Sequence, residues 1–146
     1  MTKLTVSVLV KAPLATVWDA MWNPEHIIHW GFADGTTWHC PWAKGEAPKV
    51  WGIFTTRMEA RDGSFGFDLT AQYTEVTAMK SMSYTLGEMK EYFQGAGRVV
   101  DVTFEETPEG VKVIEAFDPE DIHPAEMQIA GWSQILENFR KHVESL

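Results

Sequence analysis

Apolar and polar residues alternate at the start of the chain. Apolar side chains occupy every second position from Leu4 to Val10, and a period of two predicts a β-strand with one buried face. After Pro13 the apolar residues follow one another at steps of three, one and three, which predicts a helix with one apolar stripe. The stripe consists of Leu14, Val17, Trp18 and Met21.

A second, short helix is predicted directly after the first. Asn23 is a favoured N-cap residue, Pro24 suits a first helical turn, and Glu25 lies near the positive end of the helix dipole. Glycine is the favoured residue just beyond a helix. This helix is therefore expected to end near Trp30, before Gly31.

Residues 36–117 show the pattern of β-strands. The clearest alternation runs from Phe65 to Tyr73, with apolar residues at the odd positions,. Turn-forming residues separate the strands, and one loop is expected at Gly95 and Gly97. The other predicted strands are Val50–Glu59, 82–86, 100–104 and Val111–Phe117.

The last segment predicts a long helix over about residues 124–145. Pro124 suits the first turn, and Glu126 lies close to the positive end of the dipole. Such a helix would span roughly 33 Å, enough to cross a small sheet. Its apolar stripe consists of Trp132, Ile135, Leu136, Phe139 and Val143.

The order of these elements predicts the fold class. Sequential strands joined by short turns favour an antiparallel sheet, and the C-terminal helix is the natural cover for the apolar face of that sheet. We therefore expect an α+β protein with a curved antiparallel sheet of about seven strands, two short helices after the first strand, and a long C-terminal helix. No internal repeat or linker interrupts residues 1–146, so a single domain is expected.

Composition and charge narrow the functional classes. Hydrophobic residues make up 45% of the chain, which has 7 tryptophans and 8 phenylalanines. Aromatic side chains in such numbers fill a core or line an apolar pocket. The formal net charge of −9 argues against nucleic acid and against an anionic membrane as partners, because both attract lysine and arginine.

The features of the chain that bear on its location favour the cytoplasm. A lone cysteine, Cys40, cannot form an internal disulfide bond, which favours a reducing compartment. The first residues lack the unbroken apolar run of a signal peptide. No segment has the roughly 20 apolar residues of a membrane span.

Five stretches of the chain together resemble a known family. They are 12–30 (APLATVWDAMWNPEHIIHW), 56–76 (TRMEARDGSFGFDLTAQYTEV), 102–106 (VTFEE), 113–120 (VIEAFDPE) and 123–144 (HPAEMQIAGWSQILENFRKHVE). In order and spacing they resemble the family named after the activator of heat-shock-protein-90 ATPase homologue. That family belongs to the START-like (SRPBCC, birch-pollen-allergen-like) helix-grip superfamily.

The resemblance implies a helix-grip fold with an apolar cavity between sheet and C-terminal helix. Members of the superfamily bind lipids, sterols, polyketides or other hydrophobic molecules, and a few catalyse reactions on them. The family name comes from a co-chaperone domain, and a fold alone does not fix a function. One departure is KVWGIF at 49–54, where members often carry Asp-x-Arg-x-Gly-Gly. It predicts a pocket entrance particular to this chain.

The segment from His26 to Cys40 could bind a metal ion or carry a reactive thiol, but its residue spacing favours neither. His26, His29, His39 and Cys40 are residue types that bind zinc. The segment lacks Cys-x-x-Cys spacing, and neighbouring residues on a strand point apart. Histidines on a solvated helix face are the alternative. Cys40 lacks the surroundings of a known nucleophile, so a structural thiol is preferred. No metal or other cofactor is expected.

Candidate cavity residues follow from the aromatic load and the implied fold. Bulky aromatics can close a cavity or stack on a ligand, and core filling is the alternative for each. Methionines adapt to irregular space, and a mid-helix glycine leaves room for a ligand or for close packing. The candidates are Trp30, Phe32, Trp38, Phe54, Met58, Phe67, Tyr73, Tyr84, Glu115, Met127 and Gly131.

Glu115 is the most informative of these candidates. It shares one side of its strand with Val113 and Phe117, so a buried side would carry a carboxylate that must be paired, hydrogen-bonded or protonated. The opposite parity, with Ile114 inward, would expose it. Arg57 could be its counter-charge or could be exposed.

Three functions remain open on the sequence. The first is non-catalytic binding of a hydrophobic or amphipathic small molecule in the cavity. The second is a co-chaperone-like or stress-response interaction module, with a chaperone or a second copy of the chain as partner. The third is a hydrolase-like or cyclase-like enzyme that uses Glu115 as acid or base.

Overall fold

The computed structural model describes residues 2–87 and 98–146. Within them the helices are α1 (Leu14–Trp22), α2 (Pro24–Trp30) and α3 (Ala125–Glu144). The strands are β1 (Leu4–Val10), β2 (Trp38–His39), β3 (Ala43–Lys44), β4 (Ile53–Ala60), β5 (Gly66–Thr77), β6 (Ser81–Leu86), β7 (Arg98–Thr107) and β8 (Gly110–Phe117). None of these helices is both long and apolar enough to cross a membrane.

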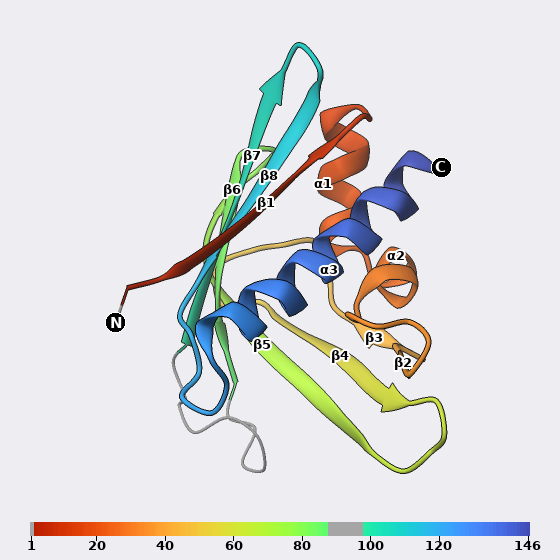
Figure 1. The fold of residues 1–146 in the computed structure, drawn as a ribbon. Helices are drawn as coiled ribbons and strands as arrows, with labels where there is room; N and C mark the ends of the chain where they lie inside the picture. Colours follow the sequence, from red (N-terminus) through yellow and green to blue (C-terminus); the bar gives the residue numbers. More distant parts are fainter. Residues whose placement is uncertain (1, 88–97) are drawn as a thin grey trace.

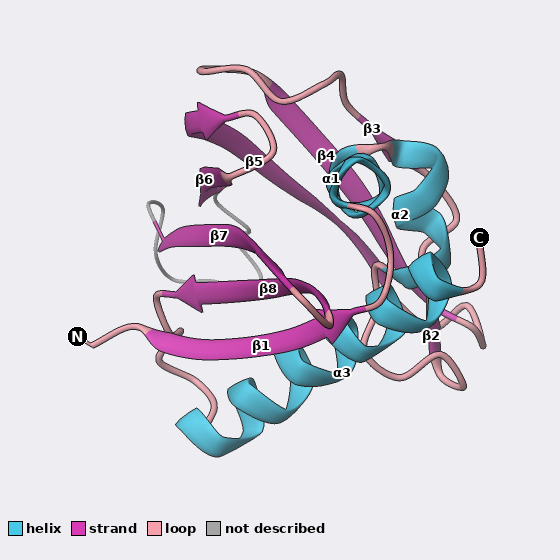
Figure 2. Ribbon diagram, turned by 90° about the horizontal axis from the view of Figure 1, so that it is seen from above, coloured by secondary structure: helices cyan, strands magenta, loops and turns pink. Residues whose placement is uncertain are grey.

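The strands form one antiparallel sheet in the order β1-β8-β7-β6-β5-β4-β2, with β3 also paired to β4. Neighbouring strands from β4 to β8 are sequential, whereas β1 pairs with β8 at one edge and β2 pairs with β4 at the other. Figures 1 and 2 show the sheet curling around α3, with α1 and α2 beside the C-terminal part of that helix. The predicted α+β class and the curved antiparallel sheet around a C-terminal helix are confirmed.

The described residues contain eight strands, one more than predicted, and the difference lies between residues 36 and 53. β2 and β3 have two residues each, and a two-residue strand is too short to show a period of two. β4 begins at Ile53 and not at Val50, because Trp51 adopts a left-handed backbone with φ of 71°. The loop expected at Gly95 and Gly97 lies outside the described residues.

The two short helices begin and end as the sequence predicts. The Asn23 side chain accepts a hydrogen bond of 3.0 Å from the backbone N–H of Glu25, and Pro24 is the first residue of α2. At the end of α2, the Trp30 indole N–H donates to the carbonyl oxygen of Ala20 over 3.0 Å. This bond holds α2 against α1.

The core lies between α3 and the inner face of the sheet. Phe117 of β8 stacks on Trp132 of α3, with ring centroids 3.9 Å apart. Further along α3, the Phe139 ring meets Trp30 edge-on at 5.0 Å. Phe117 and Phe139 are both fully buried, and burying a side chain of this size stabilises a fold by roughly 1.5–3 kcal/mol. These contacts keep α3 on the sheet.

Candidate functional site

Glu115 lies on the inner face of the sheet. It stands between Val6 of β1 and Val102 of β7, two residues from the Phe117 ring that stacks on α3. Only 5% of its surface is exposed. Of the two strand parities that the sequence leaves open, the structure therefore has the one with Glu115 inward.

The Glu115 carboxylate has no hydrogen-bond or ion-pair partner in residues 2–87 and 98–146. Among those residues it is also the one buried acidic or basic residue. Burial raises the pKa of Glu115 to about 7, because a low-dielectric interior disfavours the charged form. Arg57 is not its counter-charge, since its guanidinium binds Glu59 and Asp68 at 3.0 Å each.

Three aromatic residues on the same face form what we call the aromatic cluster: Phe54 on β4, Tyr73 on β5 and Tyr84 on β6. The Phe54 ring centroid lies 5.0 Å from that of Tyr73 and 5.1 Å from that of Tyr84. The two tyrosine rings are 6.2 Å apart and meet edge-on. Of the predicted site residues, these three are in direct contact.

Both tyrosines of the aromatic cluster keep their protons. Burial raises the pKa of Tyr73 and of Tyr84, and the negative charge of Glu115 adds to the increase at Tyr84. Within the described part of the chain, neither hydroxyl has a hydrogen-bond partner. The inner face therefore presents two neutral hydroxyls and one carboxylate, and buried polar groups of this kind usually have a partner.

Gly131 leaves space on the helix that faces them. It lies three residues after buried Gln128 and four before half-buried Ile135, on the side of α3 that meets the sheet. A Cβ atom added at Gly131 would meet no atom of the described residues within 4 Å. Close helix packing, one of its two predicted uses, does not fit this geometry, and room for a ligand stays a prediction.

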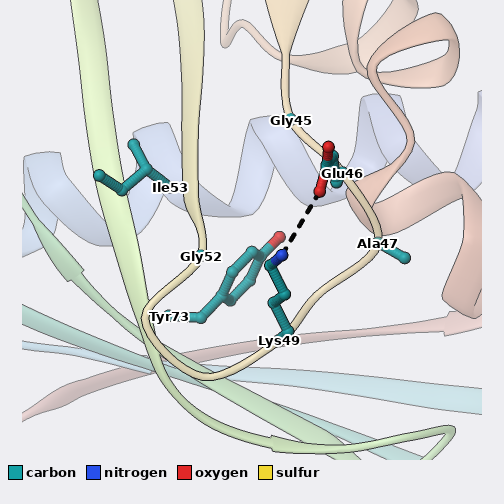
Figure 3. A pocket seen from close by; sticks show the side chains of 7 residues that line it. All are labelled: Gly45, Glu46, Ala47, Lys49, Gly52, Ile53 and Tyr73. Atoms are coloured by element: carbon teal, nitrogen blue, oxygen red, sulfur yellow. Dashed lines mark ion pairs between the residues drawn. The ribbon is translucent and has the colours of Figure 1, made fainter.

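A pocket of about 310 Å³ opens beside the aromatic cluster. Tyr73 extends from β5 into this pocket (Figure 3), so one ring belongs both to the pocket and to the cluster. Lys49 and Glu46 on the rim are ion-paired at 3.6 Å. The lining residues are Gly45, Glu46, Ala47, Lys49, Gly52, Ile53 and Tyr73. Lys49, Gly52 and Ile53 belong to segment 49–54, where the sequence predicts a pocket entrance, whereas the loop residues 45–47 have no periodic pattern that could have marked them.

Trp38 and Phe67 form a second aromatic group at the far end of the β4–β5 hairpin. The Trp38 centroid is 6.2 Å from that of Phe67 and 6.0 Å from that of Phe65. Met58 is the pairing partner of Phe67 and is half-buried. Apart from Glu115, the predicted cavity residues on the strands therefore lie in two separate groups.

The remaining candidates lie away from the aromatic cluster. Trp30 is part of the packed core between α2 and α3, and the backbone oxygen of Phe32 accepts a hydrogen bond of 2.7 Å from Asn138. Met127 is 58% exposed and does not line the interior as predicted. It precedes buried Gln128 by one position, and one helical step turns a side chain by about 100° away from the apolar stripe.

His26 and His29 both contact His142 of α3, although His26 is only half-buried and His29 is exposed. The Nδ1 atom of His26 lies 2.8 Å from the Nε2 atom of His142, and the rings of His29 and His142 stack at 5.0 Å. Burial, followed by the nearby His26 and His29, lowers the pKa of His142. His142 could not be recognised as a partner of these histidines from the sequence, because the contact joins residues far apart in the chain.

His39 and Cys40 lie apart from that histidine group. The His39 Nε2 atom is 3.8 Å from a carboxylate oxygen of Glu59. The Cys40 thiol is buried, donates to the carbonyl oxygen of Trp42 over 3.3 Å, and has a pKa raised by burial. A raised pKa disfavours the thiolate. No group of three or more His, Cys, Asp or Glu side chains in the described ranges could hold a metal ion.

A curved antiparallel sheet around a long C-terminal helix defines the helix-grip class of proteins. The family model described as "Activator of Hsp90 ATPase homolog 1-like protein" matches residues 11–144. This chain therefore belongs to the Activator of Hsp90 ATPase homolog 1-like family. A search among curated proteins found no match.

Solved structures of bacterial proteins agree with this assignment. The AHSA1-like protein from Aeromonas hydrophila is 35% identical with a TM-score of 0.84, and the match covers 98% of this chain and 92% of that one. A protein from Cytophaga hutchinsonii is 37% identical with a TM-score of 0.78 and the same two coverages. A protein from Chromobacterium violaceum has a TM-score of 0.85 at 19% identity, covers 98% of this chain and 97% of its own, and shares the fold.

Proposed function

We propose that this protein binds an amphipathic small molecule between the inner face of the sheet and α3. The observation that carries the proposal is Glu115, a carboxylate that is 5% exposed and has no partner in the described residues. An unpaired buried carboxylate costs stability, and such groups gather at binding and catalytic sites. A ligand with a polar group would give Glu115 the partner that the described residues do not supply.

Three further features support an apolar ligand with a polar end. The aromatic cluster offers ring faces that suit an apolar body. Gly131 leaves space on the opposite wall. The pocket beside Tyr73 offers a route from the surface toward the cluster. Membership of the Activator of Hsp90 ATPase homolog 1-like family supports the same kind of ligand, since proteins of the helix-grip superfamily commonly enclose an apolar cavity.

The proposal predicts that filling the space at Gly131 abolishes binding. Gly131→Leu places a side chain where an added Cβ meets no described atom within 4 Å, and we expect it to remove binding while the protein stays folded. Gly131→Ala is the matched control, because it gains about 1 kcal/mol of helix propensity yet leaves most of the space open.

Native mass spectrometry of the purified protein, before and after denaturation, measures any retained ligand. Titration with a fluorescent apolar probe then measures binding in each variant. A retained mass of a few hundred daltons, or saturable probe binding, that disappears in Gly131→Leu and persists in Gly131→Ala supports the proposal. Absence of both from the parent protein, or equal binding in the two variants, contradicts it.

A further inference from the structure

Among the residues that the structure describes, no buried cation matches the Glu115 carboxylate. Thr56, Glu115 and Gln128 are the buried polar or charged residues among those described, and none of them is a cation. Cations beside the sheet are engaged elsewhere: Lys3 binds Asp118 at 3.1 Å and Arg57 binds Asp68 at 3.0 Å. The Arg98 guanidinium on β7 donates to the Asp118 carbonyl oxygen over 3.1 Å. The missing partner of Glu115 is therefore a hydrogen-bond donor or a cation.

The aromatic cluster favours a cation over a neutral donor. Phe54, Tyr73 and Tyr84 approach one another within 5.0–6.2 Å, each from a different strand. The faces of such rings carry partial negative charge and attract ammonium groups, more strongly where water is excluded. The formal net charge of −9 also concentrates cations near the protein. An anionic ligand would meet repulsion from Glu115.

Resting on the proposed function, we propose that the ligand is an amphipathic amine. Its ammonium group pairs with the Glu115 carboxylate, and its apolar part lies against the aromatic cluster and below Gly131. Tyr84 is the ring of the cluster that feels the charge of Glu115, so the ammonium group lies between this carboxylate and Tyr84. The apolar body then extends past the rest of the aromatic cluster and along α3.

Within residues 2–87 and 98–146, few buried groups other than Glu115 can titrate. Tyr73 on β5 and Tyr84 on β6 stay neutral because burial raises the pKa of each. The partners of Glu115 on β1 and β7 are Val6 and Val102. The buried residues of α1 and α3 are not titratable: Val17, Trp18, Ala20, Met21, Gln128, Leu136, Phe139 and Val143. A change of amine affinity around neutral pH therefore reports on Glu115.

The test compares three ligands that share an eight-carbon chain: octylamine, octanol and octanoate. Isothermal titration calorimetry at pH 6 and pH 8 measures the affinity of each for the parent protein. We expect octylamine to bind about tenfold more tightly than octanol at pH 8 and octanoate to bind most weakly. The preference for the amine should shrink at pH 6, because the pKa of Glu115 is about 7 and its protonated form carries no charge.

Two variants show whether the preference comes from Glu115. Glu115→Gln keeps the shape of the side chain and should bind octylamine and octanol equally at both pH values. Glu105→Gln removes the same charge from an exposed position on β7 and should keep the amine preference.

The outcomes separate this inference from the proposed function. Octanol binding as tightly as octylamine, or an amine preference that survives Glu115→Gln, overturns the amine inference and leaves cavity binding in place. Failure of all three molecules to bind contradicts the proposed function as well. Affinity that rises toward acid pH for octanol alone would mean that protonated Glu115 acts as a donor, and it would also overturn the inference.

Discussion

At the scale of the residue, Glu115 makes stability fall as the pH rises. Its pKa is about 7 in the folded protein, above the ordinary value of 4.5. Between these values the folded state binds more protons than the unfolded state, so the free energy of unfolding decreases with rising pH. The contribution is fully present below about pH 4.5 and is lost by about pH 7. For a buried group this is on the order of 3 kcal/mol.

Glu115→Gln removes that pH dependence. We expect the variant to gain stability relative to the parent at pH 8, and to gain less or to lose stability at pH 5, because the parent is protonated there. Urea unfolding at the two pH values measures the difference. The lowered pKa of His142 gives the opposite slope, but it acts in both proteins and cancels. A stability difference that is equal at pH 5 and pH 8 would rule out a raised pKa at Glu115.

At the scale of the element, the turn before β4 is built on an unusual residue. Trp51 has a φ of 71° and is 67% exposed, while its backbone N–H donates to the Tyr73 carbonyl oxygen over 2.8 Å. A side chain at positive φ costs roughly 1–2 kcal/mol, and glycine avoids this cost. The bond to Tyr73 shows why the conformation is kept, since it ties the turn to β5.

Alanine variants are usually more stable than glycine variants, and at position 51 we expect the opposite. We expect Trp51→Gly to be more stable than Trp51→Ala by about 1 kcal/mol. At neighbouring Val50, which has no positive φ, alanine should be more stable than glycine by roughly 0.5–1 kcal/mol. Chemical denaturation of the four variants measures both differences. The same sign at both positions would refute a strained Trp51.

The elements also show what can be predicted from sequence and what cannot. Helices α1 and α3 and strand β5 repeat their period, and their positions were predicted from it. The position of α2 was predicted from the residues at its two ends. β2 and β3 are too short for a period, and the left-handed Trp51 shifted the start of β4. Glu115 could be recognised as a candidate, but the face of the sheet on which its side chain lies depends on how β8 pairs with β1 and β7. The contact between His26 and His142 depends on tertiary packing, which a local pattern does not contain.

At the scale of the whole molecule, the strands of the sheet differ in how far they are paired and buried. β7 and β8 are paired on both sides, and their residues Val100, Val102 and Val113 are fully buried. β2 and β3 contribute two residues each and both pair only with β4. Protection of backbone amides follows burial and pairing, so stability should be concentrated at the β7–β8 side.

Native-state hydrogen exchange measures this distribution. We expect the amides of Val100, Val102 and Val113 to exchange only through global unfolding, and those of Trp38–His39 and Ala43–Lys44 to exchange through local opening at much lower free energy. Equal protection of the two regions would mean that the whole sheet opens as one unit.

The pairing of β1 with β8 has a consequence for synthesis on the ribosome. β1 is translated first, yet β8 is translated after every other strand of the sheet, and α3 follows it. The nascent chain therefore carries an unpaired β1 and an uncovered apolar sheet face until its last helix has emerged. Such surfaces are prone to aggregation. The stacking of Phe117 on Trp132 forms only when α3 docks, so the interior beside Glu115 stays open to a ligand until that step.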